Sequence, residues 1–269
     1  RDRADGARLA LATGSREWGR GELFVPLRIG AMEFELGASR DDRLGERLSA
    51  DAHLPYSQAA SGLRTNTDRS IAAVFAHSAT RAGRHSLSLT AFRVEGDKGI
   101  APESDRATGA RFWRYPDLRH SLATADVVSD LGAATTLDSA VWAQHFGQTI
   151  NSYSDASYDV QAAQQIDRDR TFGFRELLTH VRGPATWIGS VNFLGSTHHQ
   201  RDIRYAGGQP PASVPAELRF SQRNWSVGAE FEWALTAKSM VDLGVGVDTV
   251  DFVDTGDKPP AKDVQGWNG

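Results

Sequence analysis

Apolar and polar residues alternate along this chain in runs of strand length, which recur from residue 7 to residue 254. In the clearest run, residues 225–235, odd positions carry Trp, Val, Ala, Phe, Trp and Leu, and even positions carry Ser, Gly, Glu, Glu and Ala. This period of two predicts a strand with one apolar and one wet face. A second run at 241–248 alternates Val or Leu with Asp or Gly, so the two runs predict an antiparallel hairpin.

Weaker runs of the same kind occupy residues 33–36, 86–91, 122–127 and 187–193. Together the runs predict about eleven strands. The runs near 136–152 and 185–205 are longer than a membrane-spanning strand needs, so we expect these strands to project above the hydrocarbon layer. Residues 43–60 carry scattered Leu and Ala between polar flanks and predict a loop with at most a short helical turn.

The connections between the runs alternate in length. Short glycine-containing turns are expected at 29–31, 81–83, 131–133 and 182–184, and long loops at 41–68, 95–116, 153–167 and 206–216. Short turns on one rim and long loops on the other are typical of outer-membrane barrels. The pattern therefore predicts an all-β fold, an antiparallel transmembrane β-barrel.

Composition narrows this prediction. The chain has 269 residues and no run of about 18 apolar residues, so no transmembrane helix is encoded. Its mean hydropathy is slightly negative, which suits a barrel because only every second residue faces lipid. The net charge of -4 makes nucleic acid an unexpected partner. The absence of Cys excludes disulfides, Cys-based zinc sites and Cys nucleophiles.

The number of predicted strands indicates whether this chain could close a barrel by itself. Bacterial single-chain barrels have even strand numbers, so an odd count near eleven would not close, although closure with ten or twelve strands stays open. The sequence begins Arg1-Asp2-Arg3, without a signal peptide or an initiator Met. We therefore expect a mature, trimmed or partial chain, and a piece of a larger barrel fits best.

Two short stretches are informative as motifs. Residues 99–103 are Gly-Ile-Ala-Pro-Glu, and residues 111–116 are Arg-Phe-Trp-Arg-Tyr-Pro. The pair resembles the barrel domain of TonB-dependent outer-membrane receptors, where a strand commonly runs into a Gly-Val-Pro-Pro-Glu stretch, and a loop then leads to an Arg-aromatic-Trp-Arg-Tyr-Pro stretch. Ile100 and Ala101 replace the Val and the first Pro of that pattern.

The resemblance implies a barrel of about 22 strands with a plugged lumen, of which residues 1–269 would form roughly the first half of the wall, with no second domain. No TonB box, no plug domain and no terminal strand ending in Phe or Trp is recognised, and residues 266–269 are expected to lie in a loop.

By resemblance, the chain belongs to a receptor in the outer membrane of a Gram-negative bacterium. Such a receptor contacts membrane lipid and takes up a scarce small-molecule or metal-chelate nutrient, such as a ferric siderophore, cobalamin or a glycan. Energy would come from the TonB complex through a plug absent from this chain, without enzymatic activity or a cofactor. The alternatives are a smaller porin or barrel enzyme of ten to twelve strands, or a soluble all-β glycan-binding protein.

Four residues of the second stretch are candidates for ligand binding. Arg111, Trp113, Arg114 and Tyr115 could form a cationic and aromatic patch in an extracellular loop, because Arg pairs with carboxylates and aromatic faces stack. The alternative is that the aromatic residues only pack a loop or line the membrane interface.

Metal-binding and catalytic sites have little support in the sequence. His198 and His199 lie near Asp202 and could share a metal ion in a loop, but adjacent residues of a strand point to opposite faces and would not share one easily. No Gly-x-Ser-x-Gly motif positions a nucleophile. We therefore expect no catalytic and no metal site. The alternating charges at 167–170 predict a solvated start of a strand. A further acidic set comprises Glu230, Glu232, Asp242 and Asp248. It predicts a solvated lumen wall that contacts a plug, and the alternative is a site of paired carboxylates on neighbouring strands.

Overall fold

The computed structural model describes residues 6–14, 18–54, 56–105, 109–260 and 262–268, so the predictions drawn from Arg1-Asp2-Arg3 lie outside the described residues. Those residues form fourteen strands, and they include no helix that could cross a membrane. The strands are β1 (Arg8–Thr13), β2 (Trp18–Ile29), β3 (Met32–Arg43), β4 (Glu46–Arg47), β5 (Leu63–Arg64), β6 (Arg69–Ala82), β7 (His85–Ile100), β8 (Phe112–Gly132), β9 (Thr135–Tyr153), β10 (Gln161–Arg182), β11 (Ala185–Arg204), β12 (Leu218–Thr236), β13 (Ser239–Thr255) and β14 (Val264–Asn268).

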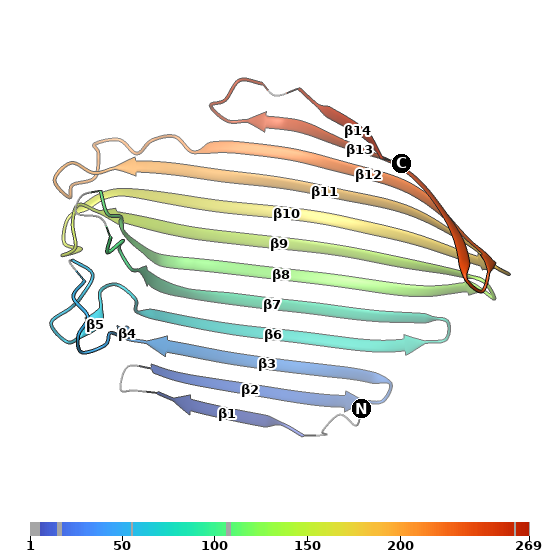
Figure 1. The fold of residues 1–269 in the computed structure, drawn as a ribbon, viewed down its shortest axis with the longest axis horizontal. Coiled ribbons are helices and arrows are strands. Elements are labelled where there is room, and N and C mark those ends of the chain that lie inside the picture. Colours follow the sequence, from blue (N-terminus) through green and yellow to red (C-terminus); the bar gives the residue numbers. More distant parts are fainter. Residues whose placement is uncertain (1–5, 15–17, 55, 106–108, 261, 269) are drawn as a thin grey trace.

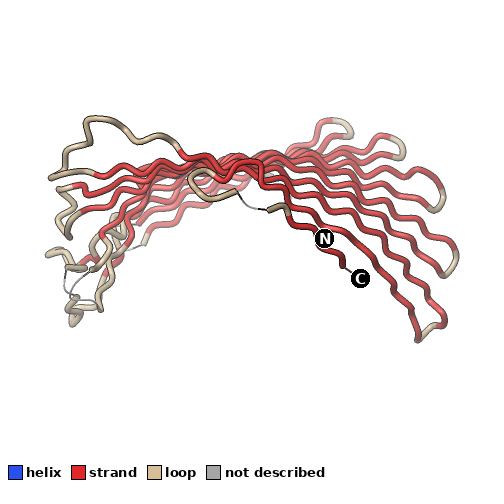
Figure 2. Tube along the Cα trace, turned by 90° about the horizontal axis from the view of Figure 1, so that it is seen from above, coloured by secondary structure: helices blue, strands red, loops and turns tan. Residues whose placement is uncertain are grey.

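Twelve strands form one antiparallel sheet in the order β1-β2-β3-β6-β7-β8-β9-β10-β11-β12-β13-β14, and β4 pairs with β5 in the connection between β3 and β6. Nearly every strand therefore neighbours the next one in sequence, and short turns line one rim while long loops line the other (Figure 1). The sheet is a single curved layer that is not closed, because β1 and β14 stand at its two ends (Figure 2). The all-β, antiparallel prediction is confirmed, with twelve strands in the sheet in place of eleven.

Several predicted boundaries were wrong because the strands are longer than the alternation suggested. Residues 95–100 belong to β7 and residues 112–116 to β8, so the loop between them covers only 101–111. Pro116 interrupts the alternation of apolar and polar residues, but it lies at a register shift in β8, where its missing N–H is tolerated. Residues 264–268 form β14, which the weak alternation of the sequence Val-Gln-Gly-Trp-Asn had concealed.

The two faces of the sheet differ in exposure as well as polarity. Along β7, the exposed Leu87, Leu89 and Ala91 alternate with less exposed residues, and β12 repeats this with Trp225 and Val227. A curved sheet spreads side chains apart on its convex side, so we assign the exposed apolar set to that side and call it the apolar face. The opposite face, called the lumenal face, carries the alternating polar residues, such as Ser88 and Thr90 in β7.

This arrangement is the inverse of a water-soluble sheet, whose apolar face is buried. Among the described residues the only buried apolar side chains are those of Ala140, Ile203 and Pro102, whereas large side chains such as Trp187 and Leu243 are more than half exposed. No second layer covers the sheet in the part of the chain that is described (Figure 2). The pattern is that of a barrel wall facing lipid.

Glycine positions on the lumenal face accommodate aromatic rings of the next strand. A Cβ at Gly173 would lie 2.3 Å from Cζ2 of Trp142 and 2.9 Å from the carbonyl oxygen of Phe193. The Trp142 ring therefore covers the Gly173 backbone, which fixes the pairing of β9 with β10 at this point.

Candidate functional site

A groove of about 710 Å³ lies near the long-loop ends of β9 to β13. The strand register explains its position, because Phe146, Asp169, His198 and Phe220 are cross-strand neighbours on four consecutive strands and share the lumenal face. Further lining residues supply hydroxyl, amide and ammonium groups; they include Gln144, Thr171, Ser196, Gln222 and Lys258.

A histidine held by carboxylates forms the polar centre of the groove. The Nδ1 of His198 donates to Oδ1 of Asp169 at 2.6 Å, and its Nε2 lies 4.0 Å from Oδ1 of Asp167. Asp167 is only 3% exposed, and its oxygens accept hydrogen bonds from Gln148 at 2.8 Å and from Gln165 at 2.9 Å and 3.0 Å. The imidazole is therefore oriented by a prearranged polar network.

This network corrects one expectation and agrees with another. The residues 167–170 do not form a solvated start of a strand, because they lie inside β10 and Asp167 is buried. The two adjacent histidines do point to opposite faces: His199 contacts Oε2 of Glu217 at 3.2 Å rather than the Asp167 network. Sequence reasoning missed the role of Asp167 because two of its partners, Gln148 and His198, come from the neighbouring strands β9 and β11.

Aromatic rings extend from the groove across the lumenal face. The ring of Phe220 lies 5.9 Å from that of His198, and Phe146 lies 6.1 Å from His120, which in turn contacts Phe92 at 5.0 Å. Carboxylate, imidazole and amide groups beside aromatic faces are a combination that can orient a small polar ligand and also stack against it.

The four residues predicted to bind ligand lie elsewhere. Trp113, Arg114 and Tyr115 belong to β8 and not to a loop, and Arg111 directly precedes that strand, so the predicted loop location was wrong for three of them. None of the four lines the groove. Their ligand-binding role stays a prediction, and each has a contact within the chain.

Arg114 fastens the long loop 44–68 to the sheet. Its guanidinium donates to both oxygens of Asp68, at 2.5 Å and 3.0 Å, and to Oδ1 of Asn66 at 2.8 Å. Asn66 adopts a left-handed φ of 57° and donates from Nδ2 to the carbonyl oxygens of Ile100 and Trp113, at 2.7 Å and 2.6 Å. A Cβ at Gly99 would lie 2.3 Å from Oδ1 of Asn66. Both motif stretches therefore have a structural role. Gly99 leaves space for the Asn66 side chain, and Arg114 holds Asn66, the anchor of the loop, in place.

Arg111 organises the neighbouring loop. Its backbone N–H and its Nε donate to the two oxygens of Glu103, at 2.8 Å and 2.5 Å, and its guanidinium lies 5.0 Å from the ring of Trp113. These hydrogen bonds, led by the one from the backbone of Arg111, lower the pKa of Glu103 to about 2. Lys98 and Tyr115 form a similar cation–aromatic contact at 5.0 Å.

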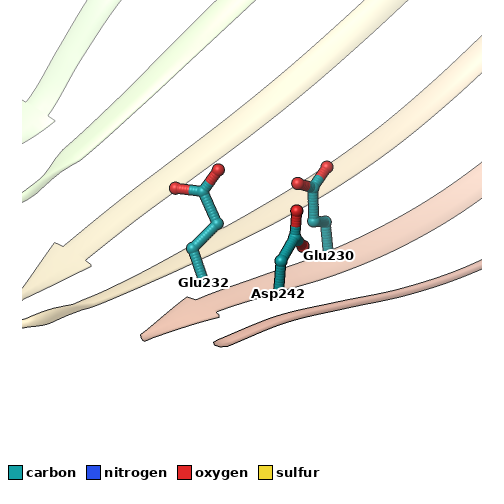
Figure 3. A group of neighbouring side chains, drawn as sticks. All are labelled: Glu230, Glu232 and Asp242. Carbon is teal, nitrogen blue, oxygen red and sulfur yellow. The ribbon is translucent and has the colours of Figure 1, made fainter. Parts of the chain in front are cut away.

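A carboxylate cluster lies toward the short-turn rim of β12 and β13. Carboxylate oxygens of Glu230, Glu232 and Asp242 lie within 4.8 Å of one another, and no other group of three metal-ligating residues this close occurs among the described residues. Figure 3 shows the three side chains projecting to the same side of the sheet. Asp248 is not part of this group. Asp242 is exposed and the two glutamates are partly exposed, which fits a solvated wall, so the expectation of no metal site is kept as a prediction.

Comparison with known proteins yields a match in fold only. The sequence matches no family model and no curated protein. Solved structures with the same fold include the copper transporter OprC (TM-score 0.72, 10% identity, 97% of this chain and 41% of that chain). The ferric preacinetobactin receptor BauA from Acinetobacter baumannii gives a TM-score of 0.67 at 12% identity, over 97% of this chain and 43% of that chain.

The open form of the ferric-catecholate import receptor Fiu from E. coli K12 gives a TM-score of 0.63 at 12% identity, over 100% of this chain and 51% of that chain. The chain thus spans between 41% and 51% of the length of these three structures. The barrel fold implied by the resemblance to TonB-dependent receptors is confirmed.

Proposed function

We propose that this chain forms part of the wall of an outer-membrane receptor that takes up a small-molecule or metal-chelate nutrient in a Gram-negative bacterium. The observation that carries the proposal is the exposed apolar face of a curved antiparallel sheet whose fold matches solved uptake receptors and a transporter. A lipid bilayer would cover that face at no cost in exposed apolar surface. The role is transport and not catalysis, and its energy would come from the TonB complex through a plug domain.

The groove around His198 is the proposed ligand contact within this wall. It faces the lumen near the long-loop rim, where a ligand arriving from outside would first meet the barrel interior. The named relatives handle copper, ferric preacinetobactin or a ferric catecholate. A ferric chelate suits the groove because its polar ligand atoms could hydrogen-bond to His198 and its rings could stack on Phe220. Cobalamin and glycans are the other ligand classes we propose to screen.

The test is a binding titration on the complete protein purified in detergent, with ferric siderophores, copper, cobalamin and oligosaccharides as probes. In His198→Ala, the affinity for whichever probe binds should fall about tenfold, because the variant loses the imidazole's hydrogen bond to the ligand and the polar network that orients it. His199→Ala is the matched control, because it removes the neighbouring imidazole from the opposite face. Equal affinities for both variants and the native protein would refute the groove as the site.

A further inference from the structure

The groove around His198 has an acidic lining. Among the described residues that line it, Asp169 and Asp254 supply carboxylates, and the basic groups come only from Lys258 and His198. No arginine of the described chain lines it. The ammonium of Lys258 is already paired, since its Nζ lies 3.3 Å from Oδ1 of Asp257. Little positive charge is therefore left for an anionic ligand.

The run of alternating charges at 167–170 explains why no guanidinium from β10 reaches the groove. Because successive strand residues point to opposite faces, Asp167 and Asp169 face the lumen, and Arg168 and Arg170 stand on the apolar face. On that face Arg168 lies 3.8 Å from Glu217. The strand thus sorts the run by sign, with the acidic residues inside the barrel wall.

The negative charge of the groove does not depend on the protonation of His198. Two carboxylates flank this one imidazole, with Nδ1 at 2.6 Å from Asp169 and Nε2 at 4.0 Å from the buried Asp167. A proton on the imidazole would offset one of these two charges and leave the other. Burial of Asp167 lowers the local screening by water, so its charge acts strongly on a ligand in the groove.

The groove also has groups that can hold a cation. The side chain of Asp169 is 37% exposed, so it can accept a further hydrogen bond from a ligand. Oδ1 of Asp254 accepts the N–H of Gly256 at 3.0 Å, and its other oxygen has no hydrogen bond among the described residues. Phenylalanine rings complete the lining, and an aromatic face attracts a cation that lies over it; they belong to Phe146, Phe220 and Phe252.

From this charge distribution we infer that the groove selects its ligand by charge. It accepts a ligand that carries a positively charged group, such as a metal chelate with a protonated amine, and it rejects anionic chelates. The amine would lie between the exposed carboxylates while the body of the ligand packs on the phenylalanine rings. The inference rests on the proposed function of this groove as the ligand contact, and it adds the charge that the ligand must have.

The experiment is a binding titration on the complete protein in detergent, with three forms of one linear ferric trihydroxamate. Its terminal amine is left free, acetylated or succinylated, so the same chelate carries a positive, zero or negative net charge. The native protein should bind the cationic form about tenfold more tightly than the anionic form. The double variant Asp169→Asn/Asp254→Asn should lose most of this preference. Asp126→Asn is the matched control and should keep it, because Asp126 lies on the lumenal face of β8 toward the short-turn rim.

A second readout needs no bound ligand. A spin label attached in the Ser196→Cys variant lies in the groove, where its access to a cationic and to an anionic paramagnetic agent can be compared. The cationic agent should be favoured by about threefold, and the double aspartate variant should bring the two agents close to equality.

A preference for the cationic form that the double variant loses supports the inference. Equal or tighter binding of the anionic chelate would overturn it, as would equal access of the two agents to the label. If none of the three chelates binds, the label alone decides, and a preference for the cationic agent supports the inference. The proposed function fails separately, when His198→Ala leaves the affinity for every probe unchanged.

Discussion

Replacing Arg114 tests whether this motif residue fastens loop 44–68 to the sheet. In Arg114→Ala, three hydrogen bonds to Asn66 and Asp68 are lost. Hydrogen bonds to charged groups contribute about 1.5–3 kcal/mol each when well shielded. The side chains of Arg114 and Asp68 are 30% and 32% exposed, so solvent screening reduces the total, and we expect the loop to lose about 2 kcal/mol of local stability.

That loss corresponds to a roughly 30-fold larger opening constant. Amide hydrogen exchange of the complete protein can measure it at Gly99, whose N–H donates to Asp68, and at Thr65, whose N–H donates to Ser57. Arg114→Lys keeps the charge without the planar fork and should show about half of the free-energy loss. Arg111→Ala is the control, because Arg111 holds the other loop through Glu103. Unchanged exchange in Arg114→Ala, together with weakened ligand binding, would refute the anchoring role and favour a ligand contact.

Two further changes test local features. Gly173→Val should destabilise the barrel by about 1–3 kcal/mol, because its side chain would collide with Trp142 and the Phe193 carbonyl. Gly189→Val is the control and should not destabilise it, since nothing lies within 4 Å of a Cβ there. Urea unfolding in lipid vesicles measures both variants, and equal unfolding midpoints would contradict the packing of Trp142 on Gly173. The pKa of Glu103 is about 2, below its ordinary 4.5, so the tether to Arg111 should be fully present above pH 4.5 and lost as pH falls toward 2. NMR titration of a ¹³C-labelled Glu103 carboxyl measures this, and a midpoint near 4.5 would contradict it.

The sheet was largely predictable because alternation and turns are local properties of the sequence. The run 225–235 and its partner at 241–248 needed no distant information, and β12 and β13 pair as expected. The strand ends were harder, since polar residues near the long-loop rim no longer alternate with apolar ones. Residues 95–100 and 112–116 therefore looked like loop although they pair in β7 and β8.

The candidate site was not predictable for a different reason. Asp169, His198 and Phe220 are far apart in sequence and meet only through the register of β10, β11 and β12. A shift of one residue in that register would send each side chain to the other face. The anchor at Asn66 depends in the same way on a left-handed backbone conformation that no sequence pattern indicated.

The most direct test of the account is a cysteine scan of residues 225–231 in the complete protein, reconstituted in lipid bilayers. The chain contains no cysteine, so spin labels can be attached one position at a time. The account predicts a period of two: labels at Trp225, Val227, Ala229 and Phe231 should be accessible to oxygen dissolved in lipid, and labels at Ser226, Gly228 and Glu230 to a water-soluble nickel chelate. Equal access of the nickel chelate to both sets would contradict a lipid-facing wall.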